Sequence, residues 1–273
     1  MNLADPLTAL ARRAGEAIMQ VYAGEFEVQT KADASPLTAA DLRAHRIIVD
    51  GLRRMTPEVP VISEESEPAD FEVRRTWGSY WLVDPLDGTR EFVNRNGDFT
   101  VNIALIDANQ AVLGVVGVPV REEVFFGDVV SGIAYKTTRD GRETLKTRPV
   151  SQAQGLTVVA SRSHGSNRLE RYLDALAATL GPVTRQSIGS SLKFCILAEG
   201  LADFYPRLGP TSEWDTAAAQ AVLTAAGGAV LRFDGSELAY NTKASFLNPD
   251  FFCIGDPTFP WAERLPPAEV PPD

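Results

Sequence analysis

Two aspartates at the end of an apolar run are the residues of this chain best suited to metal chemistry. The run Trp-Leu-Val at residues 81–83 leads into Asp84-Pro-Leu-Asp87, so an apolar strand is expected to deliver both carboxylates to a turn. Carboxylates at the end of a buried element need a compensating charge, because desolvating an unpaired charge is costly. Hard divalent cations prefer oxygen ligands. We therefore expect Asp84, Asp87 and the Leu86 carbonyl to point toward one metal ion.

The two residues that follow, Gly88 and Thr89, predict the start of a helix. Free backbone N–H groups at such a position favour an anion such as phosphate. A solvated turn also explains an isolated Asp-Pro-Leu-Asp-Gly motif. Two further acidic positions favour the metal-site interpretation over the turn.

One of these positions is Glu64-Glu65, which ends a short β-branched run at residues 59–62, and the other is Asp215, at the start of an Ala-rich helical stretch. Element ends that each carry an acid can converge on one cluster of oxygen ligands, as a site for two or more Mg²⁺ ions requires. A zinc site is not favoured, because the chain has only two histidines and two cysteines.

The elements that must position these acids begin with two predicted helices, which follow from the apolar spacing of residues 7–21 and 42–52. The second helix begins at Thr38-Ala-Ala-Asp41, a variant of the capping box, so capping alone is a sufficient explanation of Asp41. The polar stretch between Glu65 and Trp77 predicts a surface loop. Strands are expected at residues 26–30, 99–107, 111–118 and 123–127.

From residue 156 onward strands and helices alternate, which predicts a second α/β layer packed on the first. We therefore divide the chain into an N-terminal α+β layer, residues 1–150, which carries most of the acids, a C-terminal α/β layer, residues 151–260, which carries Asp215, and a Pro-rich tail, residues 261–273. The tail is expected to lie extended on the surface or to be mobile. The elements expected in the second layer are strands at 156–160, 183–186 and 202–205 and helices at 167–180, after 189–193 and from 214.

Composition limits the classes of function. With 273 residues and 44% hydrophobic content, the chain is expected to form a soluble globular protein with a large core. A formal net charge of −10 argues against a nucleic-acid polymer as partner, whereas a small phosphorylated substrate stays compatible with it. Two cysteines with apolar neighbours indicate buried, reduced thiols. A charged N-terminal segment and the lack of a long uncharged run predict a cytoplasmic location.

In order and separation, the acidic motifs resemble the three signatures of the inositol monophosphatase superfamily of Mg²⁺-dependent, lithium-sensitive phosphatases. The matching residues are Glu64-Glu65, Asp84-Pro-Leu-Asp87-Gly-Thr89 and Trp214-Asp215. Four further stretches look like those of the bacterial 3′(2′),5′-bisphosphate nucleotidases within that superfamily. They are Ser35-Pro-Leu-Thr-Ala-Ala-Asp41, Ser161-Arg-Ser-His164, Ser187-Ile-Gly-Ser-Ser-Leu-Lys-Phe194 and Tyr205-Pro-Arg-Leu-Gly-Pro-Thr211, so that the resemblance covers roughly residues 5–255.

This resemblance implies an αβαβα sandwich and hydrolysis of the 3′-phosphate of adenosine 3′,5′-bisphosphate to AMP and phosphate, in a context of sulfur assimilation. It leaves open a peripheral association with the cytoplasmic face of the inner membrane. It also implies ligands for two Mg²⁺ ions, with Glu64 facing a weaker third. Glu64, Asp84 and the Leu86 carbonyl would hold the first ion, and Asp84, Asp87 and Asp215 the second.

The catalytic roles implied by the resemblance fall on three residues. In an in-line displacement, one metal lowers the pKa of a bound water and the other stabilises the leaving ribose oxygen. Thr89, with Glu64 and Asp41 as proton acceptors, would orient the attacking water. Asp41 thereby becomes a catalytic candidate as well as a helix cap. The backbone amides at residues 88–90 would receive the phosphate.

Substrate discrimination is expected to come from the second layer, because a metal cluster engages any phosphate monoester. The resemblance implies that Ser163 and His164 contact the nucleotide, although a lone histidine more often has a structural role. Gly189 and Ser190 can present amides and a hydroxyl to phosphate at a helix start, with Lys193 adding a cation. The alternative is an ordinary helix cap with a solvated lysine. The other residues expected to contact the substrate are Arg207, for the second phosphate, and Asp87, Gly88, Thr89 and Asp215.

Three functions compete at this point. The first is a bisphosphate nucleotidase with a small phosphorylated nucleotide as substrate and no obligate protein partner. The second keeps the chemistry and acts on inositol monophosphate or a sugar bisphosphate. The third is a nucleotide-binding sensor without turnover, which the complete set of acids disfavours, because a pure binder does not need residues that activate water.

Overall fold

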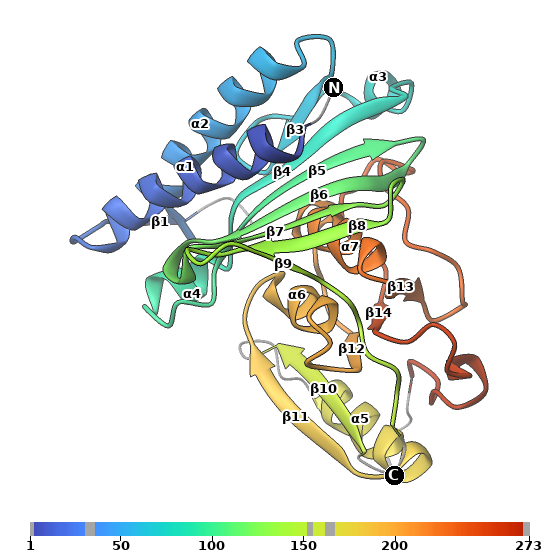
Figure 1. Ribbon diagram of the computed structural model, residues 1–273. Coiled ribbons are helices and arrows are strands. Elements are labelled where there is room, and N and C mark those ends of the chain that lie inside the picture. Colours follow the sequence, from blue (N-terminus) through green and yellow to red (C-terminus); the bar gives the residue numbers. More distant parts are fainter. Residues whose placement is uncertain (1–2, 31–35, 152–154, 162–166, 270–273) are drawn as a thin grey trace.

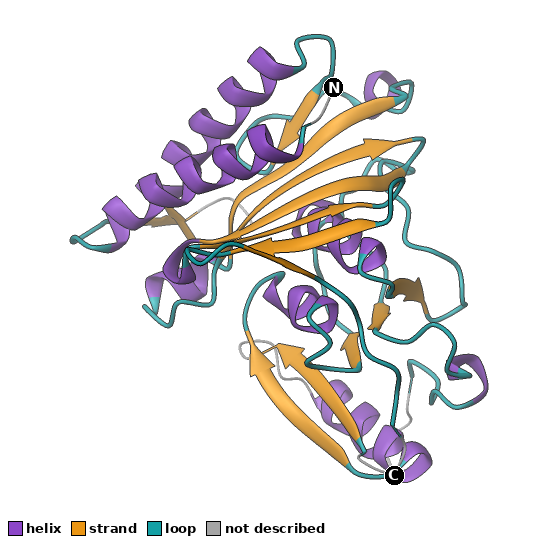
Figure 2. Ribbon diagram, in the orientation of Figure 1, coloured by secondary structure: helices purple, strands orange, loops and turns teal. Residues whose placement is uncertain are grey.

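The computed structural model describes residues 3–30, 36–151, 155–161 and 167–269. Helices and strands lie in separate layers (Figures 1 and 2). The α-helices are α1 (Ala4–Tyr22), α2 (Ala39–Met55), α3 (Phe71–Arg74), α4 (Thr89–Val93), α5 (Asn167–Leu180), α6 (Leu192–Ala198) and α7 (Glu213–Ala225), and the short 3₁₀ helices are η1 (Pro119–Arg121) and η2 (Trp261–Glu263).

The strands form two large sheets and a small ribbon. The larger, seven-stranded sheet has the order β3 (Val61–Ser63), β4 (Ser79–Asp87), β5 (Thr100–Asp107), β6 (Gln110–Val118), β7 (Glu123–Asp128), β8 (Ile133–Thr137) and β9 (Arg142–Thr144). The five-stranded sheet has the order β11 (Val183–Ile188), β10 (Leu156–Ser161), β12 (Phe204–Arg207), β14 (Phe251–Ile254) and β13 (Ala229–Arg232). The ribbon pairs β1 (Val28–Thr30) with β2 (Pro36–Thr38).

The layers follow the αβαβα order that the resemblance implied, and this expectation is confirmed. Helices α1 and α2 cover one face of the seven-stranded sheet, and α6 and α7 lie between that sheet and the smaller one (Figure 1). Helix α5 packs on the far side of the smaller sheet. Three separate clusters of buried apolar residues fill the spaces between the successive layers.

Strand β4 shows why its sequence is apolar without a break. Successive side chains of a strand point to opposite faces, and here Trp81 and Val83 enter the core under α1 and α2. Tyr80 and Leu82 enter the opposite core beneath α6 and α7. Both faces of the strand are therefore buried, as is usual for a strand covered by helices on both sides.

The register of β4 against β5 then changes at the acidic motif. Asp84 lies opposite Asn102 and Asp87 lies opposite Thr100, with an irregularity between the two pairs. Pro85, which has no N–H to donate to the ladder, lies at this irregularity. The interruption frees the end of the strand to turn its two carboxylates toward the same side.

Several expectations about the elements are wrong. The segment between Glu65 and Trp77 is not only a surface loop, because it contains α3, whose Arg74 is buried and stacks on the Phe246 ring. Nor is the start of the tail merely extended, since Trp261 is buried and stacks on Phe204 at a ring-centroid distance of 5.1 Å. Arg74, in a polar stretch, and Trp261, in a Pro-rich one, each pack against an aromatic residue that is distant in the sequence. The strands that the sequence did not predict are β2, β8, β9, β13 and β14.

The division of the chain at residue 150 stays a prediction. The described strands of the larger sheet end at residue 144 and those of the smaller sheet begin at residue 156. Helix α7, however, packs on β5, β6 and β7 of the first sheet although it belongs to the second half of the sequence.

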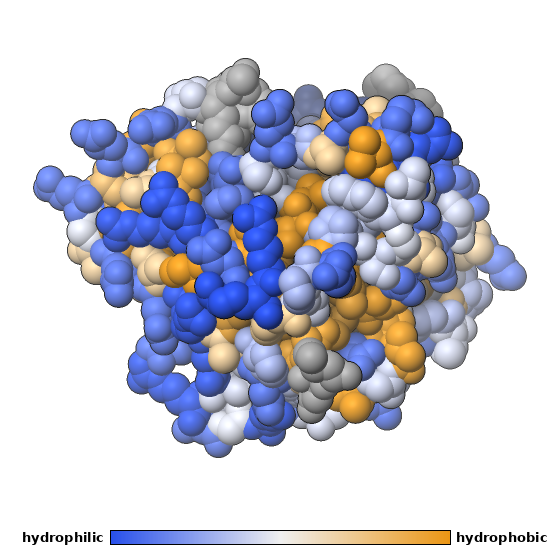
Figure 3. All heavy atoms as spheres, turned by 90° about the horizontal axis from the view of Figure 1, so that it is seen from above, coloured by the Kyte–Doolittle hydropathy of each residue, from blue (hydrophilic) through white to orange (hydrophobic). Residues whose placement is uncertain are grey.

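Within the described residues, no helix has both the length and the apolar character that crossing a membrane requires. In Figure 3 the face seen from above carries mostly hydrophilic residues around a band of apolar ones.

Close packing of α7 on the first sheet yields a prediction about stability. A β-carbon added at Gly114 of β6 would overlap the carbonyl oxygen of Ala218 in α7. We expect Gly114→Ala to lower the free energy of unfolding by about 1–3 kcal/mol, because overpacking forces the helix away from the sheet. The matched control is Gly78→Ala, where nothing lies within 4 Å of the added atom. Chemical denaturation measures both, and equal stabilities would contradict the close approach.

Candidate active site

Three carboxylates from distant parts of the chain meet at the end of β4. One ligand oxygen each from Asp84, Asp87 and Asp215 lies within 4.8 Å of the other two. Asp84 and Asp87 come from the strand end, and Asp215 comes from the first turn of α7. The structure thus brings together three of the acids that the sequence singled out.

Each of these carboxylates has one oxygen fixed by donors of the protein itself. Asp84 Oδ1 accepts a hydrogen bond from the Leu86 N–H at 3.0 Å, within the strand end. Asp215 Oδ2 accepts from the Ser212 N–H at 2.9 Å and forms the reciprocal half of a capping box. One oxygen of each side chain is oriented in this way.

Asp87 is held by a more extensive set of donors. Its Oδ2 accepts from the Ser191 N–H at 2.5 Å, from the Thr100 hydroxyl at 3.3 Å and from the Asn102 amide at 3.5 Å. The Ser191 hydroxyl in turn bonds Asn102 and Thr100, both at 2.8 Å. Thr100, Asn102 and Ser191 are buried, so this network links the strand end to the loop before α6 in the absence of solvent.

Glu64 lies next to the cluster. Its backbone N–H bonds the Val83 carbonyl at 3.1 Å, which places it at the end of β3 beside β4. A hydrogen bond between the Glu64 and Asp84 side chains contributes to raising the pKa of Asp84. Glu64 therefore lies beside Asp84, and its membership of the ligand set stays a prediction.

Burial and mutual repulsion raise the pKa values of these acids. Burial, followed by the charge of Glu64, raises the pKa of Asp84 well above 3.8. Burial also raises the pKa of Asp215, with Asp87 as the next cause. The pKa of Asp87 is raised to about 6 by burial, against the lowering effects of Lys193 and the Ser191 N–H. An oxygen-only cluster of buried like charges is the donor set that a hard divalent cation fits.

Asp41 and Thr89 form a pair beside this cluster. The Thr89 hydroxyl can donate to two acceptors, Asp41 Oδ1 at 3.3 Å and the Leu86 carbonyl oxygen at 3.2 Å. Asp41 Oδ2 accepts from the Thr38 N–H at 2.8 Å and from the Thr38 hydroxyl at 2.7 Å, which confirms the predicted capping box. One oxygen of Asp41 serves the cap and the other serves Thr89, so the two explanations of this residue are compatible.

A pocket of about 340 Å³ opens beside the carboxylates. Asp87 of β4 and Asp215 of α7 line it, as do Gly88 and Thr89 at the start of α4. Ser190, Lys193 and Arg207, which the sequence predicted to contact substrate, also line this pocket. Ser163 and His164 lie outside the described residues.

Gly189 differs from the expectation for a substrate-binding residue, and the burial of Lys193 decides between its two interpretations. The Gly189 N–H donates to Asp98 Oδ2 at 3.1 Å, so it is not directed to a phosphate. A glycine is needed there because a β-carbon would come within 2.8 Å of Glu91 and Asp98 atoms. The alternative of a solvated Lys193 is wrong, since its side chain is buried.

Two of the cations that line the pocket, Lys193 and Arg207, are tied to the backbone. Lys193 Nζ donates to the Ser190 carbonyl at 2.6 Å, and Arg207 donates to the carbonyls of Gly209 at 3.1 Å and Pro210 at 2.6 Å. Burial, followed by the charge of Arg207, lowers the pKa of Lys193 to about 8. Lys193 therefore remains mostly protonated at neutral pH.

Sequence reasoning missed the residues that orient Asp87. Thr100 and Asn102 lie within a predicted strand, and Ser191 was considered only as part of a helix start. One signal was present, because Thr100 and Asn102 are polar residues at the beginning of an otherwise apolar strand. Their partner could not be identified without the register of β4 and β5.

The layered fold, the buried acidic cluster and the adjoining pocket together define a metal-dependent phosphatase of the αβαβα type. The chain belongs to the inositol monophosphatase family, whose model matches residues 2–250. This confirms the resemblance predicted from the motifs. Members of this family depend on metal ions for activity.

Individual relatives are similar over nearly their whole length. The 3′(2′),5′-bisphosphate nucleotidase CysQ of Escherichia coli K12 is 52% identical over 249 residues, which are 90% of this chain and 97% of the relative. The CysQ nucleotidase of Salmonella typhimurium is 52% identical over 244 residues, 89% and 95% of the two chains. A crystal structure of CysQ from Bacteroides thetaiotaomicron matches with a TM-score of 0.79 at 40% identity and covers 92% of this chain and 97% of its own.

Because the carboxylates of the cluster repel one another, each is expected to lower the free energy of unfolding when no metal is bound. Asp84→Asn removes one charge and keeps an oxygen that can accept from Leu86. In metal-free protein at pH 8 we expect it to raise the free energy of unfolding by on the order of 1 kcal/mol. Because the pKa of Asp84 is raised in the folded state, the penalty is absent below about 3.8 and grows as the pH rises above it.

Thermal unfolding with a chelator at pH 4 and pH 8 measures this difference. The variant should gain stability at pH 8 and little at pH 4, and it should lose the extra stability that Mg²⁺ gives the wild type. A variant less stable than the wild type at pH 8 without metal would show that the cluster is not under repulsive strain.

Proposed function

We propose that this chain is a Mg²⁺-dependent 3′(2′),5′-bisphosphate nucleotidase that hydrolyses the 3′-phosphate of adenosine 3′,5′-bisphosphate to AMP and phosphate. The observation that carries the proposal is the cluster of Asp84, Asp87 and Asp215 at the edge of the 340 Å³ pocket. The high identity to nucleotidases named CysQ supports the choice of substrate. A cytoplasmic location, lithium sensitivity and a link to sulfur assimilation remain predictions.

Mg²⁺ is the ion that we propose for the cluster. Asp84, Asp87, Asp215, Glu64 and the Leu86 carbonyl would hold two ions, and Glu64 would face a third if one binds. Bound Mg²⁺ would supply an activated water and neutralise the charge that develops on the leaving oxygen. The protein's own contribution is to fix the carboxylates, through Leu86, Ser212 and the Thr100–Asn102–Ser191 network, before the ions arrive.

Thr89 and Asp41 would prepare the attacking water. Because the Thr89 hydroxyl donates to Asp41 Oδ1, its oxygen can accept a hydrogen bond from the water. Asp41 is buried and fixed by Thr38, so it keeps the hydroxyl in one orientation. Glu64, whose side chain lies beside that of Asp84, would accept the proton that the water loses.

The second layer would recognise the nucleotide. Lys193 and Arg207 place two positive charges in the same pocket as the acids. A substrate with a phosphate at each of two positions can use both kinds of group at once, whereas inositol monophosphate has only one phosphate. The two cations therefore favour a bisphosphate, and the identity to nucleotidases named CysQ favours a nucleoside bisphosphate over a sugar bisphosphate.

The role of Thr89 can be tested with two variants. Thr89→Val removes the hydroxyl and keeps the shape, so we expect kcat to fall about 10²- to 10⁴-fold. Thr89→Ser keeps the hydroxyl and should retain turnover within about tenfold of the wild type. Steady-state phosphate release measures both. Similar activity of the two variants would exclude a role of the hydroxyl in orienting water.

The substrate can be tested by phosphate release from adenosine 3′,5′-bisphosphate, inositol 1-phosphate and fructose 1,6-bisphosphate, with Mg²⁺ and with or without lithium. We expect the highest kcat/KM for the adenosine compound, loss of activity without Mg²⁺, and inhibition by lithium. Asp87→Asn serves as the inactive control. A preference for the inositol or sugar compound would reassign the substrate, and nucleotide binding without turnover would favour a sensor.

A further inference from the structure

The first residue of α7, Glu213, is held by a segment that lies outside the proposed active site, residues 240–248. Its side chain is fully buried (0% exposed). Its carboxylate accepts from the Asn241 N–H at 2.8 Å and from Lys243 Nζ at 3.3 Å. Its backbone N–H donates to the Phe246 carbonyl at 2.8 Å. A buried carboxylate is tolerated only with such donors, so this contact ties the helix start to the segment.

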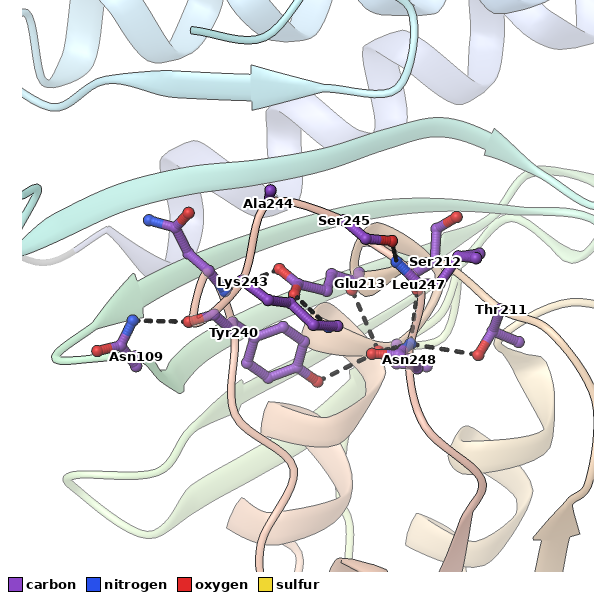
Figure 4. A network of polar contacts seen from close by, with 12 residues as sticks. Asn109, Thr211, Ser212, Glu213, Tyr240, Lys243, Ala244, Ser245, Leu247 and Asn248 are labelled. Atoms are coloured by element: carbon purple, nitrogen blue, oxygen red, sulfur yellow. Dashed lines mark hydrogen bonds and ion pairs between the residues drawn. The ribbon is translucent and has the colours of Figure 1, made fainter. Parts of the chain in front are cut away.

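Asn248 adds a second attachment on the other side of the helix cap, as Figure 4 shows. Its side-chain amide donates to the Thr211 hydroxyl at 3.2 Å, the Ser212 carbonyl at 2.8 Å and the Thr216 hydroxyl at 3.1 Å. Its backbone N–H bonds the Thr211 carbonyl at 2.8 Å. One side chain therefore spans the cap residue Ser212 and the first helical turn.

The segment is itself anchored to the first sheet and α3. Arg74, which is buried, donates to the Lys243 and Ala244 carbonyls at 3.2 and 2.5 Å. The Asn109 side chain, in the turn between β5 and β6, donates to the Tyr240 carbonyl at 2.7 Å (Figure 4). The start of α7 is consequently fixed relative to the sheet that carries Asp84 and Asp87.

The remainder of α7 packs on the sheet largely through small residues. Four of them are the buried alanines Ala217, Ala218, Ala219 and Ala221, and the backbone of Val222 lies against Gly127 of β7. Small side chains permit close approach but offer few protrusions that would lock a helix against sliding or rotation. Asp215 is two residues from Glu213 and bonds the Ser212 N–H, so its carboxylate moves with the helix start.

We infer that Glu213 and Asn248 are positioning residues that hold the helix start so that Asp215 meets the strand-end aspartates. This inference rests on the proposed function in one respect, that Asp215 is a metal ligand. Groups that orient metal ligands typically affect metal affinity 10- to 100-fold when they are removed. The two residues thus act on the metal site without touching it.

The test is to measure, by calorimetry and without any nucleotide, how Mg²⁺ binds to the metal-free protein. Glu213→Gln keeps an acceptor for Asn241 but loses the charge that binds Lys243, and we expect the Kd for Mg²⁺ to rise about tenfold. Asn248→Ala should raise the Kd for Mg²⁺ as well. This variant decides the question if Glu213→Gln does not fold. High Mg²⁺ should restore turnover in both variants.

The matched control is Leu176→Ala, which truncates a buried residue of α5 in the outermost core. It should lower the unfolding temperature and leave the Mg²⁺ binding curve unchanged. If the Glu213 and Asn248 variants lose stability but bind Mg²⁺ as the wild type does, the inference is wrong while the proposed function stands. If the wild type binds no Mg²⁺, the metal site itself is wrong, and the inference with it.

Discussion

The rest of the structure depends on one unfavourable contact, the burial of several carboxylates at the end of β4. Asp84, Asp87 and Asp215 repel one another where Asp84 is buried and the other two are half-buried, and all three have raised pKa values. Buried polar groups of this kind persist only where the surroundings determine their geometry. Each carboxylate accordingly has donors from the chain on one oxygen.

Two helices each place an acid near this strand end through the same local motif. Thr38 with Asp41 and Ser212 with Asp215 form capping boxes at the starts of α2 and α7. In each, the acid at the third helical position satisfies the cap and lies near the positive end of the helix dipole, which favours a negative charge. Because α2 and α7 lie on opposite faces of the same sheet, acids from both faces arrive at one strand end. A motif that usually stabilises only a helix here also contributes to a site.

Local signals in the sequence were sufficient for several elements and for the acids, whereas the order of the layers followed from the family resemblance. Periodicity revealed α1, α2 and β4, and the element ends revealed Asp84, Asp87, Asp215 and the cap at Asp41. What escaped prediction depends on partners that are distant in sequence. Thr100 and Asn102 are recognisable only from the register of β5 on β4. Gly189 was read as a phosphate-binding glycine, whereas its small size serves the packing on Glu91 and Asp98. Arg74 in a polar stretch gave no sign that residues 241–246 would bury it.

The charge balance of the pocket connects the two halves of the molecule. Lys193 lowers the pKa of Asp87, and Arg207 lowers that of Asp215, so each cation of the second layer partly offsets an acid of the cluster. Ser191 joins the same two regions, since its N–H binds Asp87 while Lys193 lies two residues further along the chain. A shift of the loop before α6 would therefore disturb an acid and a cation together. Metal ligands and substrate-binding groups are in this way parts of one electrostatic unit, although the sequence separates them by about a hundred residues.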